Sequence, residues 1–84
     1  MASKYRNAGQ TCVCTNRIFV QQGIYDAFCR KFITAVKALK VADGSSDGSQ
    51  IGPLITQDAL DGVHKLVTDS IQQGAKLVLG GKVH

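Results

Sequence analysis

The sequence predicts an α/β fold whose elements follow the order helix, strand, helix, loop, helix, strand. Two long segments carry apolar residues three or four positions apart, which is the spacing of amphipathic helices. Two short runs, at residues 17–21 and 76–79, gather β-branched and large apolar side chains between turn formers, which favours buried strands. With 44% hydrophobic and 19% charged residues, the 84-residue chain has the composition of a folded domain. We therefore expect residues 1–84 to form a single unit.

The first element is expected to be the end of a helix, over residues 1–8. Gly9 follows it and can adopt the left-handed conformation that commonly terminates a helix. The next element is the strand at 17–21, of sequence Arg-Ile-Phe-Val-Gln, which lies between Thr15-Asn16 and Gln22-Gly23. Because this strand is apolar on both faces, it needs neighbouring elements to cover it.

An amphipathic helix is predicted over residues 24–40. Its apolar positions, three or four residues apart, are Ile24, Phe28, Phe32, Ala35, Val36 and Leu39. Gly23 can cap its N-terminus. Asp26 lies in the first turn, where the helix dipole favours a negative charge, and Lys37 and Lys40 lie near the opposite end. The direction and the buried face of this helix are therefore both specified.

The second half of the chain is expected to contain a surface loop, a helix and a strand. Residues 43–50 are all turn formers, which indicates a loop. Thr56 can cap a helix that ends before Gly74. The apolar stripe of that helix is Leu60, Val63, Val67 and Ile71. The run at 76–79, closed by Gly80-Gly81, predicts the second strand. Two strands are too few for a self-sufficient sheet, so both should need pairing from outside this segment.

Charge and hydropathy patterning argue against nucleic acid and membranes as partners. The net charge of +4 comes from ten basic residues spread along the chain, and only Arg30-Lys31 are adjacent, whereas a nucleic-acid footprint is clustered. No apolar run approaches the length of a membrane span, and the N-terminus lacks the order of a signal peptide. Three cysteines, two of them one residue apart, do not make a secreted disulfide framework. We therefore expect a cytoplasmic protein.

The stretch Arg6-Asn7-Ala8-Gly9-Gln10-Thr11-Cys12-Val13-Cys14 admits three interpretations of its two thiols. A zinc site would recruit Cys29 and His64, but structural zinc sites usually separate paired cysteines by about two to four residues, and no second pair exists here. We therefore expect no metal. The two remaining interpretations are a nucleophilic Cys12 and a buried structural cysteine.

Cys12 has the neighbours that thiol catalysis needs. A thiolate attacks a carbonyl carbon well, and a cation or backbone N–H groups pointing at it favour the thiolate form. Gly9-Gln10 lets the backbone turn sharply, which could aim nearby amides at one substrate oxygen. Arg6 precedes this turn, and a guanidinium suits a planar carboxylate through two parallel hydrogen bonds. Spacing alone still leaves the structural cysteine open.

The segment from Arg6 to Cys12 resembles the active-site cysteine motif of the aldehyde dehydrogenases, in which the cysteine after Gly-Gln-x is the nucleophile. Further blocks resemble that family in order and spacing. They are Asn16-Arg17-Ile18-Phe19-Val20-Gln21, the helix from Tyr25, Gln50-Ile51-Gly52-Pro53-Leu54-Ile55, Gly74-Ala75-Lys76 and Gly80-Gly81-Lys82. The resemblance covers essentially the whole chain, and within the family it is most similar to the succinate-semialdehyde dehydrogenases.

This resemblance implies roles for three residues. Cys12 would be the nucleophile, forming a thiohemiacetal and then a thioester with the aldehyde substrate. Arg6 would bind the distal carboxylate of succinate semialdehyde. Cys14 is a redox-switch candidate, because the matching residue oxidises with the nucleophile to a disulfide in some members. Glutarate semialdehyde or another aldehyde is the alternative substrate.

The resemblance also implies a cofactor-binding domain and catalytic residues that lie outside this 84-residue segment. Family members are several times longer, bind NAD or NADP on a Rossmann-like domain, and use a glutamate base and an asparagine of the oxyanion hole from upstream segments. All six acidic residues here are Asp. We therefore expect a slice of the catalytic domain of a homo-oligomeric parent, with no cofactor bound by the slice and no turnover of its own. The alternative is a structural α/β fragment without activity.

Overall fold

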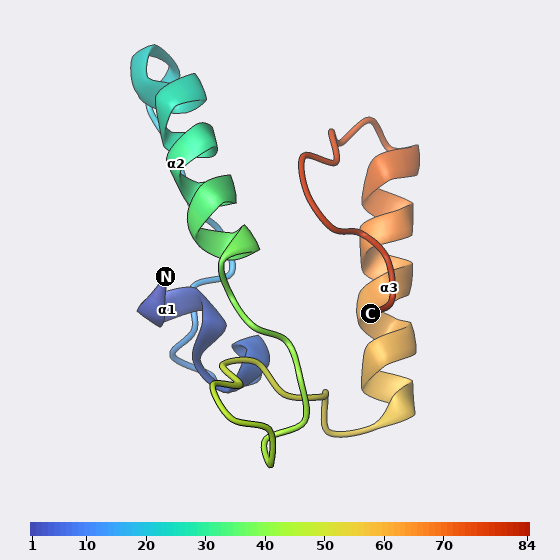
Figure 1. Cartoon of the computed structure of the whole chain (residues 1–84). Helices are drawn as coiled ribbons and strands as arrows, with labels where there is room; N and C mark the ends of the chain where they lie inside the picture. The colour runs from blue at the N-terminus through green and yellow to red at the C-terminus, as the bar shows by residue number, and fades with distance from the viewer. The chain divides into compact units, whose positions relative to one another are not determined.

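Three α-helices and two short 3₁₀ turns make up the regular structure of the chain. The computed structural model describes all 84 residues. The elements are α1 (Ala2–Tyr5), η1 (Arg6–Gly9), η2 (Gln22–Ile24), α2 (Tyr25–Lys37) and α3 (Gln57–Gln72) (Figure 1). The chain divides into two compact units, Met1–Pro53 with the elements up to α2, and Leu54–His84 with α3. Whether both belong to one catalytic domain stays a prediction.

The N-terminal helix is shorter than predicted, because α1 ends at Tyr5. Arg6 leaves the helical region with φ −57° and ψ 128°. Asn7, Ala8 and Gly9 then take left-handed conformations, with φ of 51°, 55° and 81°. Left-handed residues cannot continue a right-handed helix. The prediction of helix through residue 8 was therefore wrong, whereas the left-handed conformation expected at Gly9 is confirmed.

The amphipathic helix predicted over residues 24–40 forms as α2, which follows directly on η2 and ends at Lys37, before Leu39 and Lys40. Gly23 lies inside η2 rather than at the cap, and the N-cap position of α2 carries no side-chain hydrogen bond. Phe28 and Phe32 are partly buried, and their rings stack with centroids 5.5 Å apart. The Phe32 ring also lies 6.3 Å from the ring of Tyr5. One ring contact, between Tyr5 and Phe32, therefore joins the apolar face of α2 to α1.

The turn formers at 43–50 make a loop, as predicted. A parallel bridge between Val41 and Ile51 closes its base. Inside it, Ser45 donates from its backbone N–H and from its hydroxyl to Asp43 Oδ1, at 2.8 and 2.7 Å. These two hydrogen bonds hold the pKa of the Asp43 carboxyl below its ordinary value, and the bond from the hydroxyl has the larger effect. The loop is thus organised by its own side chains.

The helix α3 begins and ends where its capping residues predict. The Thr56 hydroxyl oxygen accepts a hydrogen bond from the Ala59 N–H at 3.0 Å, which satisfies one free donor of the first turn. Gly74 follows the helix with φ 101°, and the Ala75 N–H donates to the Ser70 carbonyl at 3.0 Å, as in a Schellman motif. None of the helices is long and apolar enough to cross a membrane.

Neither predicted strand forms, because no segment of the chain pairs with residues 17–21 or 76–79. The run at 17–21 makes no ladder hydrogen bond, and the ring of Phe19 is 92% exposed. A run of strand-forming residues becomes a strand only when a neighbouring backbone supplies its hydrogen bonds. The two longer helices and the loop of the predicted order are therefore confirmed, whereas the two strands, which were expected to need pairing from outside this segment, are not confirmed.

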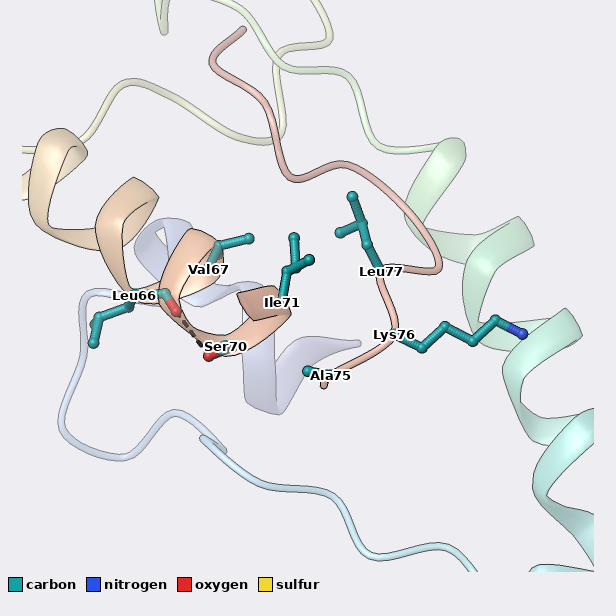
Figure 2. Close-up of a pocket in the computed structure, with 7 residues that line it drawn as sticks. All are labelled: Leu66, Val67, Ser70, Ile71, Ala75, Lys76 and Leu77. Atoms are coloured by element: carbon teal, nitrogen blue, oxygen red, sulfur yellow. Dashed lines mark hydrogen bonds between the residues drawn. The ribbon is translucent and has the colours of Figure 1, made fainter. Parts of the chain in front are cut away.

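A groove in the second unit lies between the C-terminal half of α3 and the segment that follows it. Figure 2 shows Val67, Ile71 and Leu77 pointing into this groove, whereas Lys76 points away from it. Its volume is about 250 Å³. The other lining residues add one hydroxyl, that of Ser70, which donates back to the helix backbone. The groove therefore offers apolar packing surface and no catalytic group.

Candidate active site

The segment with the predicted nucleophile folds into a tight loop after α1. The Cys14 N–H donates to the Thr11 carbonyl at 2.9 Å, which closes a turn around Cys12. The next amide, that of Thr15, donates to the Ser3 carbonyl at 2.7 Å. The loop therefore leaves α1 and is tied back to α1 immediately after the two thiols.

The entry to this loop depends on a run of left-handed backbone. Gly9 has φ 81°, and a Cβ added to it would lie 3.4 Å from the Lys4 carbonyl oxygen. Asn7 and Ala8 adopt the same region although they carry side chains. Asparagine tolerates this region, whereas for Ala8 it costs about 1–2 kcal/mol. Such strain persists where the surrounding contacts determine the conformation, and it is concentrated at functional sites. The sharp turn expected ahead of Cys12 is present.

Cys12 is an exposed free thiol. It sits at the tip of the turn, between Thr11 and the buried Cys14. A small electrophile can reach an exposed sulfur without any movement of the loop. The position suits a nucleophile and does not suit a buried structural cysteine, the competing interpretation of this residue.

Arg6 is exposed at the start of the same loop. It lines a groove of about 280 Å³ in the first unit. The other lining residues are Met1, Ala2, Tyr5, Leu39, Gln50 and Ile51. Cys12 does not line this groove, and no hydrogen bond or ion pair joins it to Arg6. The structure therefore places the two predicted site residues on one loop but not in one pocket.

Cys14 is the one buried residue of the chain, with 6% of its surface exposed. Its Sγ donates a hydrogen bond to the Arg6 carbonyl oxygen at 3.5 Å, across eight residues of sequence. Sequence reasoning did not anticipate this contact. The only signal in the sequence was the residue type, because free cysteine is among the most frequently buried residues. Cys14 thus joins the end of the loop to the backbone of its first residue.

Cys29 and His64, the two residues that a zinc site would recruit, both lie on helices. The hydrogen bond between the Tyr25 hydroxyl and the Cys29 thiol of α2 raises the pKa of the Tyr25 hydroxyl. His64 is exposed on α3. No group of three or more His, Cys or Asp side chains lies close enough to hold a metal ion.

The residues of this chain do not fit a dinucleotide cofactor. Dinucleotide sites of α/β proteins hold the pyrophosphate at a glycine-rich turn between a strand and the N-terminus of a helix. This chain has no strand, and neither groove is lined by such a turn. Neither groove therefore has the features of such a dinucleotide site.

One protein family matches the whole sequence. The sequence profile of the aldehyde dehydrogenase family matches residues 1–84, and the chain belongs to that family. The mitochondrial succinate-semialdehyde dehydrogenase of Arabidopsis thaliana is 51% identical over 84 residues, which are all of this chain and 16% of that protein. The glutarate-semialdehyde dehydrogenase of Pseudomonas putida is 51% identical over 81 residues, 96% of this chain and 17% of that protein.

The crystal structure of an aldehyde dehydrogenase from Brucella melitensis biovar abortus superposes with a TM-score of 0.93 at 54% identity, over 98% of this chain and 17% of that one. The crystal structure of an NADP dependent enzyme of Escherichia coli superposes with a TM-score of 0.95 at 49% identity. The match covers 99% of this chain and 17% of that one. The chain therefore has the fold of one part of an aldehyde dehydrogenase, and it spans about a sixth of the length of the curated relatives.

Proposed function

We propose that this segment belongs to the catalytic domain of an enzyme that oxidises succinate semialdehyde to succinate with NAD or NADP, and that Cys12 is its nucleophile. The observation that carries the proposal is the loop from Arg6 to Cys14. It exposes the Cys12 thiol and the Arg6 side chain while hydrogen bonds hold its backbone. Identity of about half the residues with a succinate-semialdehyde dehydrogenase along the whole chain supports the choice of substrate.

Cys12 supplies the bond-forming step of this reaction. Its thiolate adds to the aldehyde carbon, so the S–C bond forms while the carbonyl π electrons move to oxygen. Backbone N–H groups are the donors that stabilise such an oxyanion in other enzymes. The oxidation and the hydrolysis of the thioester need a nicotinamide cofactor and a base from the rest of the protein.

Arg6 is the proposed clamp for the distal carboxylate of the substrate. A guanidinium binds a planar carboxylate through two parallel hydrogen bonds, which orients the aldehyde end of a short semialdehyde. Arg6 forms no ion pair within this chain, so its charge is available to a substrate. The pocket that joins Arg6 to Cys12 would be completed by other segments.

Glutarate semialdehyde is the second candidate substrate, since a glutarate-semialdehyde dehydrogenase is equally similar in sequence. It differs from succinate semialdehyde by one methylene group. One methylene in a pocket is worth about 1–3 kcal/mol in discrimination, or roughly 10–200-fold in kcat/KM. The ratio of the two kcat/KM values therefore identifies the natural substrate.

A different class of function is a structural unit whose thiol is inert without the rest of the protein. We propose that the 84-residue chain alone shows no turnover with succinate semialdehyde and either NAD or NADP, because it has no cofactor site. Steady formation of reduced cofactor by the isolated chain would disprove this. A cytoplasmic location, a homo-oligomeric parent and Cys14 as redox partner of Cys12 stay predictions.

The substrate assignment is tested with Arg6→Ala in a full-length enzyme that carries this segment. We expect kcat/KM for succinate semialdehyde to fall by about 10²-fold or more, since a charged hydrogen bond to a carboxylate is worth about 1.5–3 kcal/mol and Arg6 can make two. Butyraldehyde, which lacks the distal carboxylate, should lose less than about threefold. Equal losses for both aldehydes would remove the clamp role of Arg6.

A further inference from the structure

We propose that Cys14 is a positioning residue, and that its buried thiol clips the loop that carries Arg6 and Cys12. The inference rests on the proposed function for the meaning of those two residues. It assigns Cys14 a role in the dithiol state of the protein, separate from any disulfide with Cys12. The clip consists of the Cys14 side chain and the two backbone hydrogen bonds beside it.

The burial of Cys14 is the first observation. It is the one buried residue in a chain whose other free cysteines are exposed, at Cys12, or partly buried, at Cys29. The side chain two residues beyond the proposed nucleophile is therefore the least exposed of the chain. A thiol is small and weakly polar, and it fills such a site without a strong demand for hydrogen-bond partners.

The second observation is where the clip attaches. The Cys14 Sγ donates to the carbonyl oxygen of Arg6, and the Cys14 N–H donates to the carbonyl of Thr11. The first bond fixes the backbone of the proposed carboxylate clamp. The second fixes the residue directly before the proposed nucleophile. Cys14 therefore bonds to the backbone of Arg6 and to that of the residue next to Cys12.

The third observation is the strained backbone that the clip encloses. Asn7 and Ala8 directly follow the Arg6 carbonyl and keep left-handed conformations. A strained conformation persists only when its surroundings determine it. The Cys14 thiol contacts the peptide group that precedes this strain, so its loss should let residues 7 and 8 relax. Relaxation would change the spacing between Arg6 and Cys12.

Amide hydrogen exchange of the reduced 84-residue chain, followed by NMR, tests the clip. We expect Cys14→Ala to speed exchange of the amides at residues 14 and 15 by about tenfold, which corresponds to one lost hydrogen bond. The amides of Ala35 and Val36 in α2 should keep their rates. Cys14→Ser keeps a donor of similar size and should restore most of the protection. Cys29→Ala, which removes the thiol on α2, is the matched control and should leave residues 14 and 15 unchanged.

A second readout follows the relation between Arg6 and Cys12 directly. Cys12 is alkylated with iodoacetate and with iodoacetamide at low salt, and the site is assigned by peptide mass spectrometry. The positive charge of Arg6 favours the anionic reagent, so Arg6→Ala should lower the ratio of the two rates by about twofold. Cys14→Ala should lower that ratio similarly, and the double variant should fall no further.

Unchanged exchange at residues 14 and 15 together with an unchanged rate ratio in Cys14→Ala would overturn the clip. Loss of protection that spreads into α2 in both the Ala and the Ser variant would also overturn it, because Cys14 would then be a general packing residue. Neither measurement uses turnover. The positioning role of Cys14 can therefore be refuted without refuting the proposed dehydrogenase activity, and the activity can be refuted without refuting the positioning role.

Discussion

The ring of Tyr5 lies 6.3 Å from the ring of Phe32, with an angle of 38° between their planes. Tyr5 is the last residue of α1, and Phe32 lies in the middle of α2 and stacks on Phe28. This contact therefore places the residue directly before Arg6 on the apolar face of the longest helix in the first unit.

Replacing Phe32 by Ala should lower the free energy of unfolding of the first unit by roughly 1–2 kcal/mol. The loss is smaller than the roughly 3–5 kcal/mol of a fully buried phenylalanine because Phe32 is partly exposed. Loss of the two ring contacts of Phe32 contributes to this change. Urea denaturation followed by circular dichroism measures the difference.

The matched control is Phe19→Ala, because the Phe19 ring is 92% exposed. It should change the free energy of unfolding by less than about 0.5 kcal/mol. If Phe19→Ala destabilised the chain as much as Phe32→Ala, the segment at 17–21 would be packed in solution, and its unpaired conformation would be wrong.

Gly9→Ala should destabilise the loop by about 1–2 kcal/mol, since the new side chain must adopt φ 81° and approach the Lys4 carbonyl. Gly62→Ala serves as its opposite, because Gly62 lies inside α3 with nothing within 4 Å of an added Cβ. That change should stabilise α3 by up to about 1 kcal/mol. Thermal unfolding of both variants measures whether each change lowers or raises stability. A rise in stability in Gly9→Ala would contradict the left-handed turn.

The Asp43 loop should weaken in acid. Hydrogen bonds from Ser45 lower the pKa of Asp43 in the folded state, so their stabilisation is complete above the ordinary carboxyl pKa of about 3.9. It is lost as the pH falls through the lower, folded-state pKa. An acid titration followed by NMR at the Ser45 amide measures that pKa. Ser45→Ala, which removes the hydroxyl donor, should move the pKa of Asp43 back toward its ordinary value; no movement would refute the hydrogen bond as its cause.

The helices could be predicted from the sequence because their signals are local. The apolar spacing of α2, the Thr56 cap and the Gly74 terminator all act within a few residues of the positions that they determine. Strand formation could not be predicted in the same way. The run at 17–21 has the composition of a strand, but no segment of this chain pairs with it. Strand formation depends on contacts between distant segments, which composition does not report.

The sequence predicts which residues form the candidate site but not how they are arranged. The motif predicts Cys12 and Arg6 as the chemically useful side chains. It does not reveal that Asn7 and Ala8 are left-handed, nor that Cys14 is buried against the Arg6 carbonyl. Both features arise when the loop closes on α1, and closure is a tertiary event. The physical distinction between the two thiols, exposed and buried, therefore appears only in the structure.

The most direct test of Cys12 as nucleophile is to trap the acyl-enzyme in a full-length protein that carries this segment. The enzyme is mixed with succinate semialdehyde and cofactor, quenched with acid during turnover, digested and analysed by mass spectrometry. We predict a succinyl group on Cys12, which is absent in Cys12→Ala and retained in Cys29→Ala. A succinyl group on Cys14 or Cys29 instead, or turnover that survives in Cys12→Ala, would contradict the assignment of Cys12.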